Sequence, residues 1–115
     1  MNKPLSHERL NHMLEAAGKI ESFCSEISYE DFLKDDILQS AVLHQFMIIG
    51  EAIIHIDDRL FLKYNYPWHL PRSFRNYIAH EYFGINFTLV WNTVKKDIPE
   101  LKNMIEKILA DLNRQ

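Results

Sequence analysis

The chain has 115 residues, of which 47% are hydrophobic and 25% are charged, with only three glycines and four prolines. This is the composition of a folded globular protein, and it excludes disordered and collagen-like chains. The length fits one domain, which we expect to span residues 1–115. The net charge of −3 argues against general nucleic-acid binding by the chain as a whole.

Cys24 is the only cysteine, so the sequence excludes an intrachain disulfide and a cysteine-rich zinc site. A single thiol favours a reducing compartment. Residues 1–8 lack the apolar segment of a signal peptide, and no apolar run approaches the ~18 residues of a membrane span. We therefore expect a cytoplasmic protein that does not cross a membrane.

The first predicted helix begins after Ser6, a favourable N-cap residue. Apolar residues at spacings of three and four between positions 10 and 27 place one hydrophobic stripe on this helix. Ser28 and Asp31 then predict a short helical turn that ends near Lys34.

The second long helix is predicted to be the central and most buried one. Asp36 and Gln39 form a capping-box pattern at its start. Apolar positions from 42 to 60 then mark a wide core face, so we expect the helix to run to about Leu62. Residues 63–70 form a loop that contains Pro67.

A third helix is predicted from Pro71 to about Phe83, because proline is well tolerated in the first turn of a helix. Gly84 fits the position that ends it. Asn86 is expected to cap a fourth helix.

Pro99 must interrupt or kink that fourth helix, because proline lacks the backbone donor and clashes with the preceding turn. Asp97 and Glu100 form another capping-box pattern, and an amphipathic repeat covers residues 101–112. No segment alternates with the period of a strand. The sequence thus predicts an all-α fold, a four- to five-helix up-and-down bundle.

Residues 59–80 carry four basic residues, no acidic residue and six aromatic ones. The basic residues are Arg59, Lys63, Arg72 and Arg75. A basic and aromatic segment of this kind suits a phosphate-bearing ligand, and Lys63 and Arg72 are candidate RNA-binding cations. The alternative is an aromatic edge of the core with solvated cations around it.

On a helical wheel the third helix has one polar side, which we expect to be exposed. This side carries Arg72, Arg75, Asn76, His80 and Tyr82 around the small Ala79. Arg75 and His80 lie about 140° apart, so a single helix does not join them. A second copy of the helix, packed across a twofold axis, would bring them together more easily.

An arginine near a histidine suits RNA cleavage without a metal. Histidine can accept the proton of a 2′-hydroxyl. Arginine can bind the phosphate through two hydrogen bonds and stabilise its developing charge. The pattern alone also fits an ordinary polar helix surface.

The segment Arg75-Asn76-Tyr77-Ile78-Ala79-His80-Glu81-Tyr82 resembles the R-x4-H-x-Y signature of the HEPN superfamily. It is most similar to HepT-type toxins, which pair with MntA-type minimal nucleotidyltransferase antitoxins. Further similar elements are Gly50-Glu51-Ala52, Pro67-Trp68, Val90-Trp91 and Ile98-Pro99-Glu100-Leu101. The resemblance covers roughly residues 36–105.

This resemblance implies a homodimer with the motif at the subunit interface and a metal-independent endoribonuclease that acts as a toxin. Carried over by position, Arg75 and His80 would be catalytic, and Asn76 would support the site. Tyr82 would match the tyrosine to which the antitoxin transfers AMP. Bulky negative charge there would repel RNA. No cofactor is implied.

Other polar residues carry weaker predictions. His44, Glu51, His55 and Asp58 share one side of the second helix, and Glu51 and His55 have the spacing of metal ligands. A polar stripe facing solvent or a partner is the stronger interpretation, and we expect no metal. Glu51 is expected near the motif helix, where it would orient His80. His7, His12 and His69 are interpreted as surface or loop residues.

Two rival functions remain compatible with the sequence. One is a non-catalytic helical subunit that binds a nucleotide or substrate for a separate nucleotidyltransferase, with Arg75 and His80 as phosphate ligands. The other is a dimerisation module whose polar helix surface is only an interface.

Overall fold

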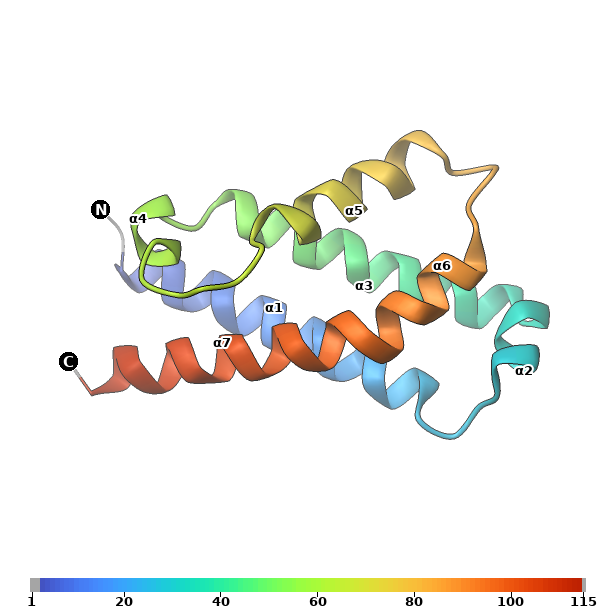
Figure 1. The fold of residues 1–115 in the computed structure, drawn as a ribbon, viewed down its shortest axis with the longest axis horizontal. Coiled ribbons are helices and arrows are strands. Elements are labelled where there is room, and N and C mark those ends of the chain that lie inside the picture. The colour runs from blue at the N-terminus through green and yellow to red at the C-terminus, as the bar shows by residue number, and fades with distance from the viewer. Residues whose placement is uncertain (1–2, 115) are drawn as a thin grey trace.

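In the computed structural model, which describes residues 3–114, every element of secondary structure is helical (Figure 1). The elements are α1 (Lys3–Cys24), α2 (Tyr29–Lys34), α3 (Asp36–Ile54), α4 (Asp58–Phe61), α5 (His69–His80), α6 (Phe87–Asn92), a π-helical turn (Thr93–Asp97) and α7 (Ile98–Asn113). The predicted all-α class is therefore confirmed. The ends of the predicted domain, residues 1, 2 and 115, lie outside the described residues.

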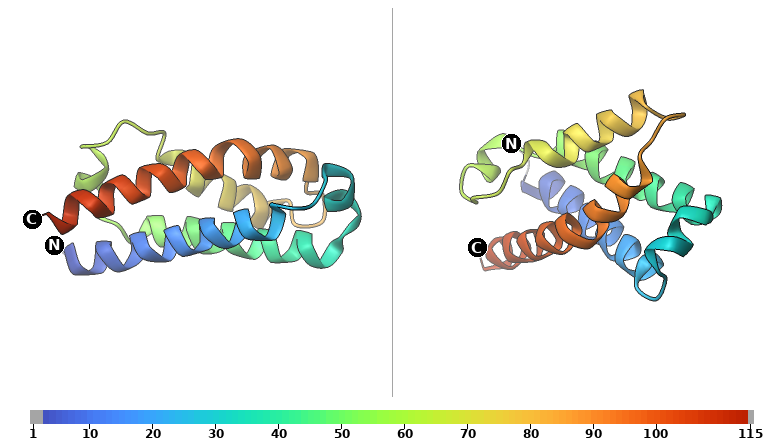
Figure 2. Two further views of the ribbon diagram at one scale, coloured as in Figure 1. Left: turned by 90° about the horizontal axis from the view of Figure 1, so that it is seen from below. Right: turned by 45° about the vertical axis from the view of Figure 1, so that its right-hand side comes forward.

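The long helices alternate in direction, as expected for an up-and-down bundle. α3 packs against both α1 and α5, and α1 packs against α7 on its other side. α1 begins and α7 ends at the same end of the molecule (Figure 2). α5 packs chiefly on α3 and stands apart from α7 at one edge of the bundle (Figure 1). Ile78 is the only residue of α5 that is fully buried.

α3 is the most apolar helix of the bundle. By length and apolar composition it could cross a membrane, so the expectation that no apolar run approaches the length of a membrane span is wrong. Half of its apolar stretch is buried inside the molecule. The packing of α3 between α1 and α5 accounts for this apolar character.

Two helix starts follow their local sequence signals. The Ser28 hydroxyl accepts a hydrogen bond from the Asp31 amide at 3.0 Å and caps α2. The Asn86 side chain accepts hydrogen bonds from the amides of Thr88 and Leu89 and caps α6. Both caps satisfy amides that have no partner within their own helix.

Ser6 is not the cap of α1, contrary to the sequence prediction. It lies within the helix, is only 3% exposed, and its hydroxyl accepts a hydrogen bond from the Asp57 amide at 3.3 Å. The start of α3 also differs from the prediction. Asp35, not Asp36, accepts the Leu38 amide, and the buried Gln39 donates its amide hydrogen to the Phe32 carbonyl.

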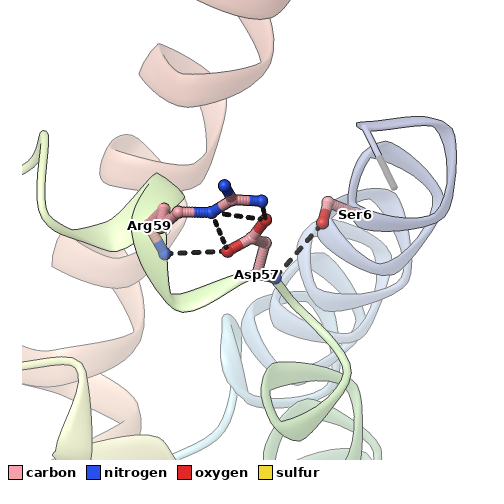
Figure 3. A network of polar contacts seen from close by, with 3 residues as sticks. All are labelled: Ser6, Asp57 and Arg59. Carbon is pink, nitrogen blue, oxygen red and sulfur yellow. Dashed lines mark hydrogen bonds and ion pairs between the residues drawn. The ribbon is translucent and has the colours of Figure 1, made fainter. Parts of the chain in front are cut away.

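α3 ends at Ile54 rather than near Leu62, because Asp57 starts a separate short helix. The Asp57 carboxylate accepts the Arg59 amide at 3.0 Å and the Arg59 guanidinium at 2.8 Å (Figure 3). These hydrogen bonds, the side-chain one first, lower the pKa of Asp57 to about 2. The Asp57 amide on Ser6 fastens the loop after α3 to α1, whereas the Arg59 hydrogen bonds hold Asp57 at the start of α4.

α5 begins at His69, two residues before Pro71, and ends at His80. The predicted extension to Phe83 is wrong, and so is the stop at Gly84. No glycine among residues 3–114 has the positive φ of a helix-ending glycine. Instead, the Glu81 amide donates to the Tyr77 carbonyl and closes the last turn, which leaves residues 81–86 as a loop.

Pro99 distorts the last helical segment without breaking it. A π-helical turn from Thr93 to Asp97 comes directly before α7, and Pro99 is the second residue of that helix. Pro99 thus lies in the first turn of α7, where a missing amide hydrogen is tolerated. Asp97 makes no capping hydrogen bond, so the predicted box at this position is wrong.

Candidate functional site

Gly50 lets α5 approach α3 closely enough to fix the position of Arg75. A Cβ atom at residue 50 would overlap the Arg75 Cβ, lie 2.6 Å from its Cγ and lie 3.2 Å from the Pro71 carbonyl oxygen. Real side chains do not tolerate such distances. The missing side chain therefore decides how the motif helix sits on the bundle.

Arg75 is held by polar partners on two helices. Its Nη2 lies 3.5 Å from Glu51 Oε1 on α3, and its Nη1 donates to Asn76 Oδ1 at 3.4 Å. Its side chain is 32% exposed. Arg75 Nε is buried and has no acceptor within residues 3–114. A guanidinium thus lies half-buried at the surface, with one of its donors unsatisfied.

Glu51 lies beside the motif helix, as predicted, but its polar contacts differ from the expectation. Within the described residues it contacts Arg75 and, at 3.3 Å, His55 Nε2, rather than His80. Nowhere in residues 3–114 do three or more potential metal-binding side chains come together, His44 and Asp58 included. Glu51 therefore bridges an arginine and a histidine on the outer face of α3 and α5.

His80 is exposed at the C-terminal end of α5, and Asn76 and Ala79 are exposed beside it. Among the residues that the structure describes, no hydrogen bond or ion pair reaches the His80 ring. Arg75 and His80 are therefore not joined within one chain, which agrees with their separation of about 140° around the helix.

Tyr82 lies beyond the end of α5 and is 63% exposed. Its ring packs edge-on against Phe83 with ring centres 5.3 Å apart, and Phe83 is fully exposed. The Tyr82 hydroxyl is thus accessible at one tip of the bundle. Two large exposed aromatic rings in one loop are unusual for a surface without a partner.

In the structure, the basic residues of 59–80 and the aromatic ones have different surroundings. Lys63 and Arg72 are exposed, whereas the charge of Arg59 is paired with Asp57. The aromatic rings pack on one another: Phe61 stacks on Trp68 at 4.2 Å. Burial, followed by Asp97 and Glu100, raises the pKa of Tyr66 to about 12. The aromatic residues that pack here form an edge of the core, as the alternative interpretation held.

Residues 13–108 match the family model described as "Ribonuclease HepT-like". The chain belongs to the HepT-like ribonuclease family. The match includes α3, α5 and the whole motif from Arg75 to Tyr82.

Curated relatives of this HepT-like chain carry ribonuclease names. A "Probable ribonuclease HepT" of Thermococcus cleftensis is 42% identical over 86% of this chain and 91% of its own length. A "Putative RNase" of Caldanaerobacter subterraneus is 36% identical over 87% and 90%. A "Gamma-glutamylcyclotransferase and putative RNase" of Methanocaldococcus jannaschii is 40% identical over 91% of this chain but only 48% of its own length. No solved structure gives a significant match.

One feature of this HepT-like site is not predictable from the sequence. Arg75 and Glu51 border a hollow of about 310 Å³ that is also lined by Arg9 and His12 of α1. The sequence predicts His12 only as a surface or loop residue, which agrees with its exposure, and makes no prediction for Arg9. No local signal links these residues to the motif helix, because His12 and Arg75 are 63 positions apart and α3 lies between their helices.

Proposed function

We propose that this chain is a metal-independent endoribonuclease toxin of the cytoplasm that cleaves RNA with Arg75 and His80 at a dimer interface. The observation that carries the proposal is the arrangement of the motif on α5. Arg75 is fixed by Glu51 and Asn76, whereas His80 and Tyr82 are exposed at the end of the helix. Membership of a ribonuclease family supports the same reading.

The proposed reaction uses groups of the chain alone. His80 accepts the proton of a ribose 2′-hydroxyl, and the 2′-oxygen forms a bond to the adjacent phosphorus. The bond from phosphorus to the 5′-oxygen breaks, and the leaving oxygen takes a proton from water. Arg75 binds the phosphate oxygens and stabilises their added charge, and the exposed Arg72 and Lys63 bind flanking phosphates.

The proposed assembly is a homodimer in which two α5 helices face each other. α5 lies at an edge of the bundle, and Ala79 in its exposed polar surface allows another helix to come close. A twofold axis there would place Arg75 of one subunit near His80 of the other. The second copy would thus bring together an arginine and a histidine that a single helix keeps apart.

The proposed control is transfer of AMP to Tyr82 by a nucleotidyltransferase antitoxin resembling MntA. The Tyr82 oxygen would attack the α-phosphorus of ATP, and pyrophosphate would leave. The exposure of Tyr82 supports access by such an enzyme. The added phosphate would repel RNA at a site that depends on cationic groups.

The proposal is tested by inducing the chain in cells without its partner. The wild type should stop growth, and His80→Ala should abolish this effect while the helical circular dichroism of the purified protein is retained. Co-expression of the nucleotidyltransferase from the neighbouring reading frame should restore growth and add one AMP to the wild type but none to Tyr82→Phe.

The controls separate the proposal from its rival. His69→Ala removes an exposed histidine from the other end of α5 and should leave toxicity unchanged. Full toxicity of His80→Ala would contradict the proposal. A harmless wild type that binds nucleotide for the neighbouring enzyme would instead favour a non-catalytic binding subunit.

A further inference from the structure

The hollow beside Arg75 is built from three helices. Arg9 and His12 come from α1, Met47, Ile48, Glu51 and Ala52 from α3, and Arg75 from α5. Because α3 lies between α1 and α5, the hollow crosses its outer face and connects the motif helix with the N-terminal helix. At about 310 Å³ it has room for a phosphate group or a sugar.

The charges around this hollow favour an anion, although the chain as a whole is acidic. Arg9 and Arg75 bring two positive charges against the single negative charge of Glu51. That negative charge is already shared between Arg75 and His55. Among the side chains that the structure describes, those of residues 6–114, none forms a hydrogen bond or ion pair with the side chain of Arg9 or His12.

Arg9 and His12 also present their polar groups from one side of α1. Residues three positions apart are neighbours on a helix surface. A guanidinium offers five N–H donors, and an imidazole offers a ring donor or acceptor, which suits phosphate and ribose oxygens. The apolar Met47, Ile48 and Ala52 complete the lining without competing for an anion.

We propose that Arg9 and His12 form a second RNA-binding subsite, which holds the backbone next to the phosphate that Arg75 contacts. This inference rests on the proposed ribonuclease function. The chain would then bind RNA along a path from α1 across α3 to α5. Arg9 would supply charge, and His12 would supply a hydrogen bond to a phosphate or ribose oxygen.

Binding of a fluorescent single-stranded 2′-O-methyl RNA tests the subsite, because this probe lacks the hydroxyl needed for cleavage. Arg9→Gln should weaken binding about three- to tenfold, and the slope of log affinity against log salt should become less steep by about 0.7, as expected for one lost phosphate contact on a single strand. His12→Ala should weaken binding less and leave the salt slope unchanged.

Lys19→Gln is the matched control, because Lys19 is an exposed cation on α1 that is paired with Glu15 and does not line the hollow. It should bind like the wild type. RNA binding by Arg9→Gln equal to that of the wild type would overturn the subsite and leave the cleavage proposal intact. A wild type that neither binds the probe nor cleaves RNA would overturn both.

Discussion

Arg75 shows how a single side chain is positioned by residues far away in the sequence. A helical wheel places it on the exposed side of α5, yet its side chain is only 32% exposed. The reason is Gly50, which lets α5 approach until the stem of Arg75 lies against α3. Glu51, the next residue, then contacts the guanidinium. The pair Gly50-Glu51 thus sets both the depth and the direction of Arg75.

Glu51→Gln should lower the kcat of RNA cleavage about two- to fivefold without raising KM. An ion pair between exposed side chains is worth up to about 1 kcal/mol, which corresponds to about fivefold in rate. The glutamine keeps the size of the side chain but not its charge. Arg75 is then less well oriented, which lowers kcat. RNA meets one negative charge fewer, so KM does not rise. Steady-state cleavage kinetics measure both constants.

Glu15→Gln provides the control, because Glu15 forms a similar exposed pair with Lys19 on α1, away from the motif. It should change neither constant. A rise in KM with unchanged kcat for Glu51→Gln would show that Glu51 binds RNA rather than positioning Arg75.

At the scale of the element, local signals predicted some helix starts and failed at others. Ser28 and Asn86 cap helices as their sequence context indicates, because each bonds to amides two or three residues ahead. Ser6 does not cap α1, because its hydroxyl accepts a hydrogen bond from the Asp57 amide, 51 positions away. Gln39 does not complete a capping box, because its buried side-chain amide donates a hydrogen bond to the Phe32 carbonyl. The sequence alone does not reveal such long-range partners.

The end of α3 illustrates the same limit. The apolar pattern continues through Ile56 and Leu60, so periodicity alone predicts one helix as far as Leu62. The structure breaks this helix at His55, and Asp57 starts α4 with the ion pair to Arg59. The core face continues across the break, which is why hydrophobic spacing did not detect it.

Gly50→Ala should destabilise the protein by about 1–3 kcal/mol, because the added methyl group forces α5 away from α3. Urea unfolding followed by circular dichroism measures this change. Cleavage should fall as well, since Arg75 moves with the helix.

Gly18→Ala is the matched control on α1, where a Cβ would meet nothing within 4 Å. It should stabilise the protein by about 0.5–1 kcal/mol, as alanine does in place of glycine within a helix. Equal stability of the two alanine variants would contradict the close approach of α3 and α5.

Asp57→Asn tests the junction between α3 and α4 through its pH dependence. The pKa of Asp57 is lowered from its usual 3.8 to about 2, first by the side-chain hydrogen bond from Arg59. A lowered pKa stabilises the fold above about pH 4, and this stabilisation is lost as pH falls towards 2. The variant should therefore unfold at lower urea concentration than the wild type at pH 7.

The difference between the two proteins should shrink as the pH falls from about 4 to about 2, because the wild-type carboxylate becomes protonated. Asparagine keeps a side-chain oxygen that can accept the Arg59 amide, so the comparison measures the effect of the negative charge of Asp57. Asp58→Asn, which removes a neighbouring exposed carboxylate, serves as the control. A difference independent of pH would contradict the Asp57–Arg59 pair.

At the scale of the whole molecule, the bundle leaves its motif helix at an edge. α3 and α7 both pack against α1, whereas α5 rests chiefly on α3 and has one fully buried residue. The up-and-down arrangement was predictable because apolar stripes and short connections specify it. The neighbourhood of Arg75 was not, because it depends on how closely three separate helices approach one another.

The same edge position leaves Arg75 and His80 unjoined within one chain. Arg75 faces Glu51 and the hollow shared with α1, whereas His80 is exposed at the end of α5 without a partner among the described residues. In the proposed mechanism, cleavage by Arg75 and His80 therefore needs a second copy of α5. The proposed dimer supplies it.

The most direct measurement is cleavage of a mixed RNA by the purified chain, free of partner and with a chelator present, beside His80→Ala. We expect the wild type to cut RNA and the variant, folded and of the same oligomeric state, to leave it intact. That result would establish metal-independent cleavage that depends on His80. An unmodified, folded dimer that leaves RNA intact would contradict the proposed cleavage, and so would equal cleavage by both proteins.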